Sequence, residues 1–265
     1  MESLAGKTVL VTGAGSGMGR ETALRLARDG ASVVLLGRRL DALEAVAAQI
    51  RSDGGSALPF AVDITDAAAV NEVLDHVRGE LGPIDVLVNN AGSSSSVLNP
   101  QWLPHDEWRH VLEVNLTAVF QLCQAVLPDM LDRGAGTIVT VSSLAAVNPN
   151  LLGGAAYGAA KAGVRNFMTF LHNTFRNQGL RAITVLPGEA DTPILDNRAR
   201  PPAAGERANM LQPADVAETV RLAIALPQRA VLQEIVVAPT RQRDTSEDLE
   251  ISRWAGAPAD RAPHA

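Results

Sequence analysis

The chain has 265 residues, 46% of them hydrophobic and 20% charged, which suits one large globular domain or two small ones. With a formal net charge of −6 and no basic stripe, we do not expect a nucleic-acid surface. The single cysteine, Cys123, excludes an internal disulfide, and its five histidines show no ligand spacing, so no metal site is expected. We also expect no signal peptide and no membrane-spanning run, which together predict a cytoplasmic protein.

The N-terminal region carries a glycine-rich motif between two apolar runs. Residues 8–11 and 33–36 read as strands, and an amphipathic segment ending at Gly30 reads as a helix. Glycines let the backbone approach a pyrophosphate, and the following helix N-terminus offers free N–H groups to it. The motif therefore predicts a dinucleotide site, the alternative being a tight turn without a ligand. Its residues are Gly13, Gly15, Ser16, Gly17, Met18 and Gly19.

The residues after the second strand indicate which dinucleotide fits. An acidic side chain at that place hydrogen-bonds the adenosine ribose and repels a 2′-phosphate. This chain has Gly37, Arg38 and Arg39 instead, and a guanidinium holds a phosphate through two parallel hydrogen bonds. We therefore expect NADP(H) to be preferred, with NAD(H) still possible. The alternative for the two arginines is a solvated helix start.

Strand and helix patterns continue to alternate. Strands are expected at 58–62 and 84–88, and helices at 40–51, 65–81 and about 106–133. The strand 58–62 leads into Asp63 and Ile64, where the carboxylate could accept from an adenine amino group. The strand 84–88 ends in Asn89, Asn90, Ala91 and Gly92, small and polar residues that suit a close approach to a cofactor.

The helix 106–133 combines apolar residues with one asparagine. Asn115 needs hydrogen-bond partners if it is buried, which points to a role in lining or bracing a site. The residues expected in the core are Trp108, Val111, Leu112, Val114 and Leu116.

Tyr157 is the only tyrosine, and Lys161 follows it by four residues. On a helix this spacing puts both side chains on one face. A free phenol titrates near pH ~10, so we expect the ammonium to lower the pKa of Tyr157 towards useful proton transfer. Ser142 and Ser143 follow an apolar strand, 137–141, and would place a hydroxyl nearby. In isolation, the motif is more typical of a core tyrosine with a solvated lysine.

The last third of the chain is less regular. After a helix that continues to Gly179, strands at 181–186 and 235–237 and a helix at 213–226 complete the core. The segment of about 190–211 is predicted to be a mobile lid over the substrate. Residues 241–265 fit no core element, so we expect a tail that is partly disordered or docks on a neighbouring subunit.

These motifs, in this order, resemble the short-chain dehydrogenase/reductase family over about residues 5–238. The resemblance implies an α/β fold, a single doubly wound Rossmann-type domain over residues 1–240 with a seven-stranded parallel sheet. It also implies dimers or tetramers that form through two long helices, about 106–133 and 157–178. The motifs that carry it are Thr12-Gly-Ala-Gly-Ser-Gly-Met-Gly, Asp63, Asn89-Asn-Ala-Gly, Asn115, Ser143, Tyr157-x-x-x-Lys161 and Pro187-Gly188 with Thr192.

The family resemblance also implies a role for each of these residues. Tyr157 would exchange a proton with a carbonyl or alcohol oxygen, and Lys161 would lower its pKa and hold the nicotinamide ribose. Ser143 would polarise the substrate oxygen, and Asn115 would hold a water that links Lys161 to solvent. Cofactor contacts are further implied for Asp63, Ile64, Asn90, Ala91, Gly92, Pro187, Gly188 and Thr192.

The leading hypothesis is an NADP(H)-dependent carbonyl reductase or a dehydrogenase of secondary alcohols or hydroxy acids. The alternatives are an NAD-dependent dehydrogenase of the same family and a non-catalytic dinucleotide sensor.

Three departures from the family pattern stand out. Tyr157 lies 14 residues after Ser143, one more than is common, which leaves Ser142 as a fallback. Glu189 is an acid expected near the nicotinamide, facing solvent or substrate, and Met18 replaces the commoner isoleucine.

Overall fold

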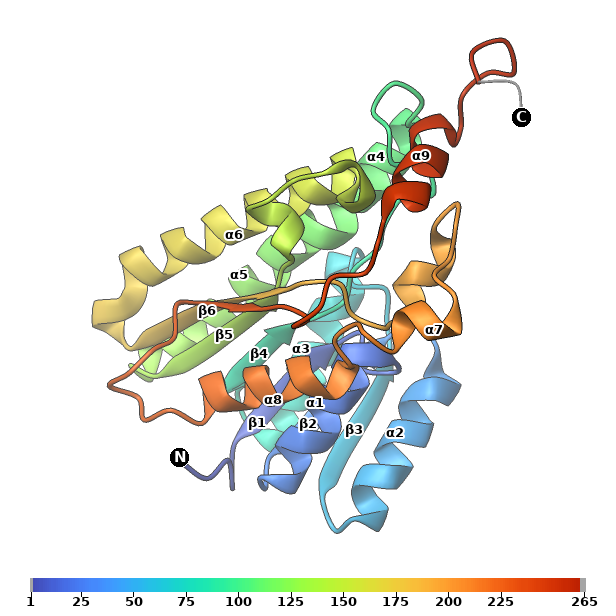
Figure 1. Ribbon diagram of the computed structural model, residues 1–265. Helices are drawn as coiled ribbons and strands as arrows, with labels where there is room; N and C mark the ends of the chain where they lie inside the picture. The colour runs from blue at the N-terminus through green and yellow to red at the C-terminus, as the bar shows by residue number, and fades with distance from the viewer. Residues whose placement is uncertain (1, 263–265) are drawn as a thin grey trace.

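The structure, a computed structural model, describes residues 2–262. Seven strands within this range form one parallel sheet in the order β3-β2-β1-β4-β5-β6-β7, with helices on both faces (Figure 1). The predicted doubly wound Rossmann-type fold is therefore confirmed. The strands are β1 (Thr8–Thr12), β2 (Ser32–Gly37), β3 (Ser56–Ala61), β4 (Val86–Asn89), β5 (Gly136–Val141), β6 (Leu180–Pro187) and β7 (Glu234–Val237).

Successive strand residues point into two separate cores. Val9 and Val11 of β1 pack under α1 (Gly17–Arg28), α2 (Leu40–Ser52) and α8 (Pro213–Ile224). Leu10, between them, packs under α3 (Ala67–Leu81), α5 (Ala118–Asp132) and α6 (Ala155–Phe175). Because both faces of the sheet are covered, its central strands are buried and mostly apolar along their whole length. This is why continuous apolar runs located them in the sequence.

Strand β3 tolerates a proline because it lies at the edge of the sheet. Pro59 pairs in register with Leu35 of β2, and β3 has no neighbour on its other side. A missing N–H is acceptable on an edge strand. The strand ends at Ala61, so Val62, which was predicted to belong to it, lies just outside.

The predicted helix 106–133 is divided by a π-helical turn. It consists of α4 (His105–Leu112), the turn Glu113–Thr117, and α5. The wider turn rotates α4 relative to α5 about the helix axis. The row of buried apolar residues along α5 therefore does not continue on the same face of α4. Val111 is buried as predicted, but the core assignment of Trp108 is wrong, since it is 37% exposed. Leu112, Val114 and Leu116 are only half-buried.

Although no membrane-spanning run was expected, the stretch His105–Asp132 is long and apolar enough to cross a membrane by length and composition alone. Helices that pack on a sheet meet the same criterion, and part of this one contributes to the core under α5 and α6. The stretch is therefore weak evidence for a membrane.

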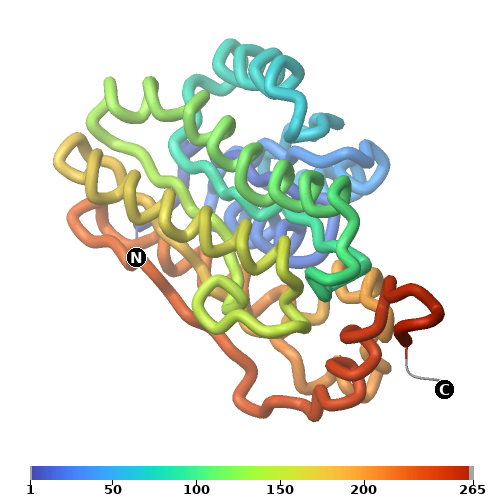
Figure 2. Tube along the Cα trace, turned by 90° about the horizontal axis from the view of Figure 1, so that it is seen from above, coloured from blue at the N-terminus to red at the C-terminus, as the bar shows by residue number. Residues whose placement is uncertain are grey.

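The end of the chain folds back on its own domain. Residues Ser246–Trp254 form α9, which buries Asp248 and Ser252. In Figures 1 and 2, this red helix lies beside the orange segment that contains α7 (Ala204–Arg207) and the green loop before α4. Asn99 Nδ2 and Trp102 Nε1 of that loop donate to the Arg253 carbonyl at 2.8 and 3.2 Å. Where a disordered or subunit-docked tail was expected, the structure thus has an intramolecular helix; residues 263–265 of that tail lie outside the described range.

Thr12 ties together the carboxyl ends of β1 and β4. Its hydroxyl accepts from the backbone N–H groups of Asn90 and Ala91, each at 3.0 Å. The Asn90 side chain donates back to the Thr12 carbonyl at 3.0 Å. The strand order reverses between β1 and β4, and in open parallel sheets ligands bind at such a point. The tie therefore fixes the floor of a potential binding site.

Replacing Thr12 by valine keeps the shape of the side chain but leaves two partly buried N–H groups without their acceptor. We expect Thr12→Val to lower the free energy of unfolding by roughly 2 kcal/mol or more, measured by urea unfolding. Thr219→Val is the matched control, because the Thr219 hydroxyl bonds only the Asp215 carbonyl of its own helix at 2.9 Å. The control should change stability by about 0.5 kcal/mol or less. Equal losses in the two variants would contradict the role given to Thr12.

Candidate active site

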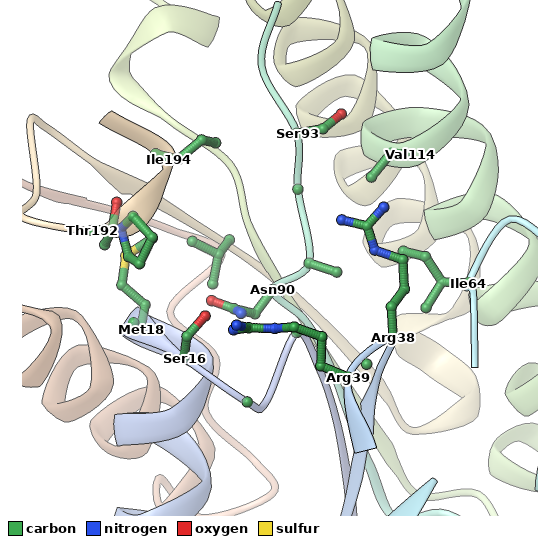
Figure 3. Close-up of a pocket in the computed structure, with 18 of the residues that line it drawn as sticks. Ser16, Met18, Arg38, Arg39, Ile64, Asn90, Ser93, Val114, Thr192 and Ile194 are labelled. Carbon is green, nitrogen blue, oxygen red and sulfur yellow. The ribbon is translucent and has the colours of Figure 1, made fainter. Parts of the chain in front are cut away.

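Two adjoining cavities open at the carboxyl ends of the strands. The first, about 680 Å³, lies over the ends of β1, β2 and β4 (Figure 3). The second, about 520 Å³, is walled by the loops after β5 and β6 and by residues 238–249. The first is called the cofactor cavity below and the second the substrate cavity. Both are lined by Met18, Ser142, Tyr157, Thr192 and Ile194.

The turn after β1 requires glycine at several positions, either for lack of space or for a positive φ angle. A Cβ on Gly19 would lie 2.3 Å from the Gly13 carbonyl oxygen, and Gly13 and Gly17 have φ angles of 65° and 53°. Helix α1 begins at Gly17 with no side-chain cap and no acidic residue in its first turn. Its first N–H groups are thus available to an anion, which is the arrangement that binds a phosphate.

Arg38 and Arg39 both point into the cofactor cavity (Figure 3). Neither forms an ion pair with any residue in the described part of the chain, although Arg38 helps to lower the pKa of Asp63. The main cause of that lowering is the hydrogen bond from the Thr65 N–H to Asp63, at 3.0 Å. The cavity therefore combines a helix N-terminus with two free guanidinium groups and an ionised carboxylate.

Most residues predicted to bind a cofactor line this cavity, but three do not. Pro187 and Gly188 line the substrate cavity instead, where the Gly188 N–H donates to the Val237 carbonyl at 2.7 Å. Gly19 packs behind the turn, in contact with Gly13 and Asn90. The residues that do line the cofactor cavity are Gly13, Gly15, Ser16, Gly17, Met18, Arg38, Arg39, Asp63, Ile64, Asn90, Ala91, Gly92, Tyr157, Lys161 and Thr192.

Three polar residues of the cofactor cavity were not predicted: Ser93, His110 and Asn197. Ser93 directly follows the motif that ends at Gly92, so an extension of that motif by one position would have found it. His110 comes from the α4 surface, and no local pattern marked it.

Tyr157 and Lys161 lie one turn apart on α6, as predicted. Lys161 is buried, and its Nζ lies 5.5 Å from the centre of the Tyr157 ring and donates to the Val141 carbonyl at 2.8 Å. The Ser142 hydroxyl donates to the Lys161 backbone carbonyl at 3.0 Å, so it is occupied. Ser143 lines the substrate cavity with Tyr157. The Ser143 oxygen accepts from the Ala145 N–H at 3.1 Å, which leaves its O–H group able to donate to a substrate, whereas the O–H group of the fallback Ser142 is already used.

The electrostatics of this pair differ from the expectation. Burial raises the pKa of Tyr157 above its ordinary value, and interactions with Ser143 and Arg198 only partly offset this. Lys161 is not among the groups that lower this pKa; its ammonium bonds the Val141 carbonyl, and burial lowers the pKa of Lys161 itself to about 8. The phenol is therefore protonated at neutral pH, the form that a proton donor needs.

The π-helical turn positions Asn115 between the long helix and the loop after β4. Its Nδ2 donates to the Val111 and Ser93 carbonyls, both at 2.8 Å. Its Oδ1 is buried without a partner and would lie 2.9 Å from a Cβ on Gly92, a point that is 3.8 Å from Lys161 Nζ. A buried acceptor without a partner is a place for an ordered water. The geometry therefore suits the water-holding role predicted for Asn115.

Metal and thiol chemistry find no support in this site. Residues 2–262 contain no group of three or more His, Cys, Asp or Glu side chains able to hold a metal ion. Cys123 is fully buried, which raises the pKa of its thiol to about 12. Such a thiol is a core residue rather than a nucleophile.

Residues 7–202 match the family described as short chain dehydrogenase. A short chain dehydrogenase from Pseudocercospora fijiensis is 37% identical over 194 residues, which cover 72% of this chain and 62% of that protein's length. The chain belongs to the short chain dehydrogenase family, and its class is therefore that of an oxidoreductase.

Solved structures agree with this assignment. A metagenomic short-chain oxidoreductase in complex with NADP is 32% identical, with a TM-score of 0.78 over 91% of this chain and 100% of that one. A 3-ketoacyl-(acyl-carrier-protein) reductase from Brucella melitensis, complexed with NADH, is 28% identical, with a TM-score of 0.80 over 90% and 99%. The similarity therefore extends through most of the fold.

Proposed function

We propose that the protein is an NADP(H)-dependent oxidoreductase that interconverts a small ketone and a secondary alcohol, with Tyr157 as proton donor or acceptor. The observation that carries this proposal is the position of Tyr157, which lines both cavities beside Lys161. Ser143 lies on the substrate side of the same phenol.

The residues of the cofactor cavity fit a dinucleotide phosphate. The uncapped N-terminus of α1 would hold the pyrophosphate, and Arg38 and Arg39 would hold the 2′-phosphate. Asp63 would accept from the adenine. A bound nicotinamide dinucleotide would supply or accept the hydride. Of the two solved relatives described above, one binds NADP and the other NADH, so the preference for NADP(H) rests on the arginine pair.

In carbonyl reduction, the Tyr157 phenol donates its proton to the substrate oxygen. The Ser143 hydroxyl bonds the same oxygen and stabilises the charge that develops on it. Lys161 and a water at Asn115 Oδ1 return a proton to the phenol from solvent. Alcohol oxidation uses the same groups in reverse, with Tyr157 as the base.

Tyr157→Phe removes the phenolic hydroxyl, which is the proposed proton donor and the partner of Ser143, and keeps the ring. We expect it to lower kcat for ketone reduction by about 10²–10⁴-fold, while NADPH binding, followed by fluorescence titration, stays nearly unchanged. Ser142→Ala and Ser143→Ala form a matched pair, and the loss of activity should be larger for Ser143. Wild-type protein that binds the dinucleotide but turns over no ketone or alcohol would favour the sensor hypothesis instead.

Arg38→Asp tests the cofactor preference. A carboxylate at this position repels a 2′-phosphate and accepts from a ribose hydroxyl. We expect the ratio of kcat/KM for NADPH over NADH to fall at least about tenfold, equivalent to about 1.4 kcal/mol. Arg229→Asp, an exposed position outside both cavities, is the control for the change in charge. An unaltered ratio in Arg38→Asp would discard the role given to this arginine.

The pKa of Lys161 predicts a pH dependence. Its folded pKa is lowered to about 8, so the ammonium is present below that pH and is lost above it. The phenol of Tyr157, whose pKa is raised, still keeps its proton there. We therefore expect kcat/KM for reduction to fall as pH rises through about 8. Lys161→Arg should shift the fall to higher pH, because a guanidinium stays charged. A flat profile between about pH 7 and 9 would count against this assignment.

An assembly of several copies is part of the proposal. Phe120 of α5 and Phe170 of α6 are 45% and 58% exposed, and Phe120 meets Phe167 edge-to-face at 5.9 Å between ring centres. Exposed aromatic residues on adjacent helices are typical of an interface. They support a dimer or tetramer that forms through these helices. A cytoplasmic location likewise remains our proposal, resting on composition.

A further inference from the structure

A cluster of ion pairs builds part of the substrate cavity wall. Arg243, only 6% exposed, donates to both carboxylate oxygens of Glu189 at 2.8 and 3.0 Å and to both oxygens of Asp248 at 2.9 and 3.1 Å. It also donates to Glu206 at 3.1 Å. Arg243 thus joins the turn after β6, helix α7 and helix α9. Glu189, expected to face solvent or substrate, lines the substrate cavity, and both of its carboxylate oxygens are held by arginines of this cluster.

Arg198 forms the cavity-facing end of the cluster. Its Nη1 donates to Glu189 Oε1 at 2.5 Å, whereas its Nε and Nη2 have no hydrogen-bond partner among residues 2–262. The side chain is 16% exposed and lines the substrate cavity. Its charge is close enough to Tyr157 to lower the pKa of the phenol. A guanidinium with an open edge therefore lines the same cavity as the proposed proton donor.

The acidic groups in this wall are already neutralised. Glu189 is paired with Arg198 and Arg243, and Glu206 with Arg200 and Arg243. Arg241, which also lines the cavity, makes no ion pair with the described residues. Asp248 also pairs with Arg200 and Arg243, so the ion pairs of this wall balance in charge. The positive groups left open to the cavity are the free edge of Arg198 and the guanidinium of Arg241, and both can bind an anion.

We propose that Arg198 is a specificity-determining residue that binds an oxyanion, a carboxylate or a phosphate, carried by the substrate beside its reacting carbonyl. Arg243 is the positioning residue, because it fixes Glu189 and so the orientation of Arg198. This inference rests on the proposed oxidoreductase function. A guanidinium binds either oxyanion through parallel N–H···O bonds, and a cavity of about 520 Å³ accommodates a small metabolite.

The test compares matched substrates by steady-state kinetics with NADPH. One pair is a keto acid and its methyl ester, and the other is a hydroxyketone phosphate and the free hydroxyketone. For wild type we expect kcat/KM to favour the anionic member of at least one pair by about tenfold or more. The favoured pair tells a carboxylate from a phosphate.

Three variants assign the preference to Arg198. Arg198→Gln should lose most of the preference for the anionic substrate, through a higher KM for that substrate. Arg198→Lys should retain part of the preference, because lysine keeps the positive charge but lacks the two parallel N–H donors of a guanidinium. Glu189 keeps both bonds to Arg243 in these variants, which protects the fold. Arg229→Gln, outside both cavities, should keep the full preference.

The outcomes separate this inference from the function on which it rests. Equal kcat/KM for both members of each pair in wild type would overturn the role of Arg198 and leave the oxidoreductase proposal standing. A preference that survives intact in Arg198→Gln would also overturn it. No turnover of any of the four substrates, or of other ketones and alcohols, would overturn the proposed function itself.

Discussion

The hydroxyl of Thr12 connects the carboxyl ends of β1 and β4, the two strands between which the strand order of the sheet reverses. By accepting from two successive N–H groups after β4, it brings the loop that begins at Asn90 against the glycine turn after β1. This contact leaves no space for a side chain at Gly13, since a Cβ there would lie 3.0 Å from the Ala91 backbone. The open N-terminus of α1 and the cavity above it follow from this contact.

Burial decides the chemistry of the proposed catalytic pair more than the charge of either residue does. Lys161 is surrounded by protein and bonds a strand carbonyl, and this burial lowers its own pKa. The pKa of the phenol is not lowered. The same burial keeps Tyr157 protonated. The π-helical turn completes the arrangement, because it brings the amide of Asn115 between Ser93 and the surroundings of Lys161.

The sequence predicted what depends on local pattern. The apolar strands, the glycine turn and the one-turn spacing of Tyr157 and Lys161 all follow from periodicity or from backbone sterics. The exposure of Trp108 did not, because the phase change at the π-helical turn leaves no mark in the residue types. The direction of the Tyr157 pKa shift was missed because it depends on how deeply the site is enclosed. The partners of Arg243 are scattered from Glu189 to Asp248, and only the folded chain brings them together.

The two halves of the site come from different parts of the chain. Residues before position 115 supply most of the cofactor cavity, whereas the substrate cavity draws its ionic wall from positions 189–206 and from the segment that ends in α9. Helix α9 is held by a handful of polar contacts and hides little of the main cores. Changes in this terminal segment would therefore alter substrate selectivity and leave the nucleotide-binding half intact. Substrate selectivity and cofactor binding can thus diverge independently among related proteins.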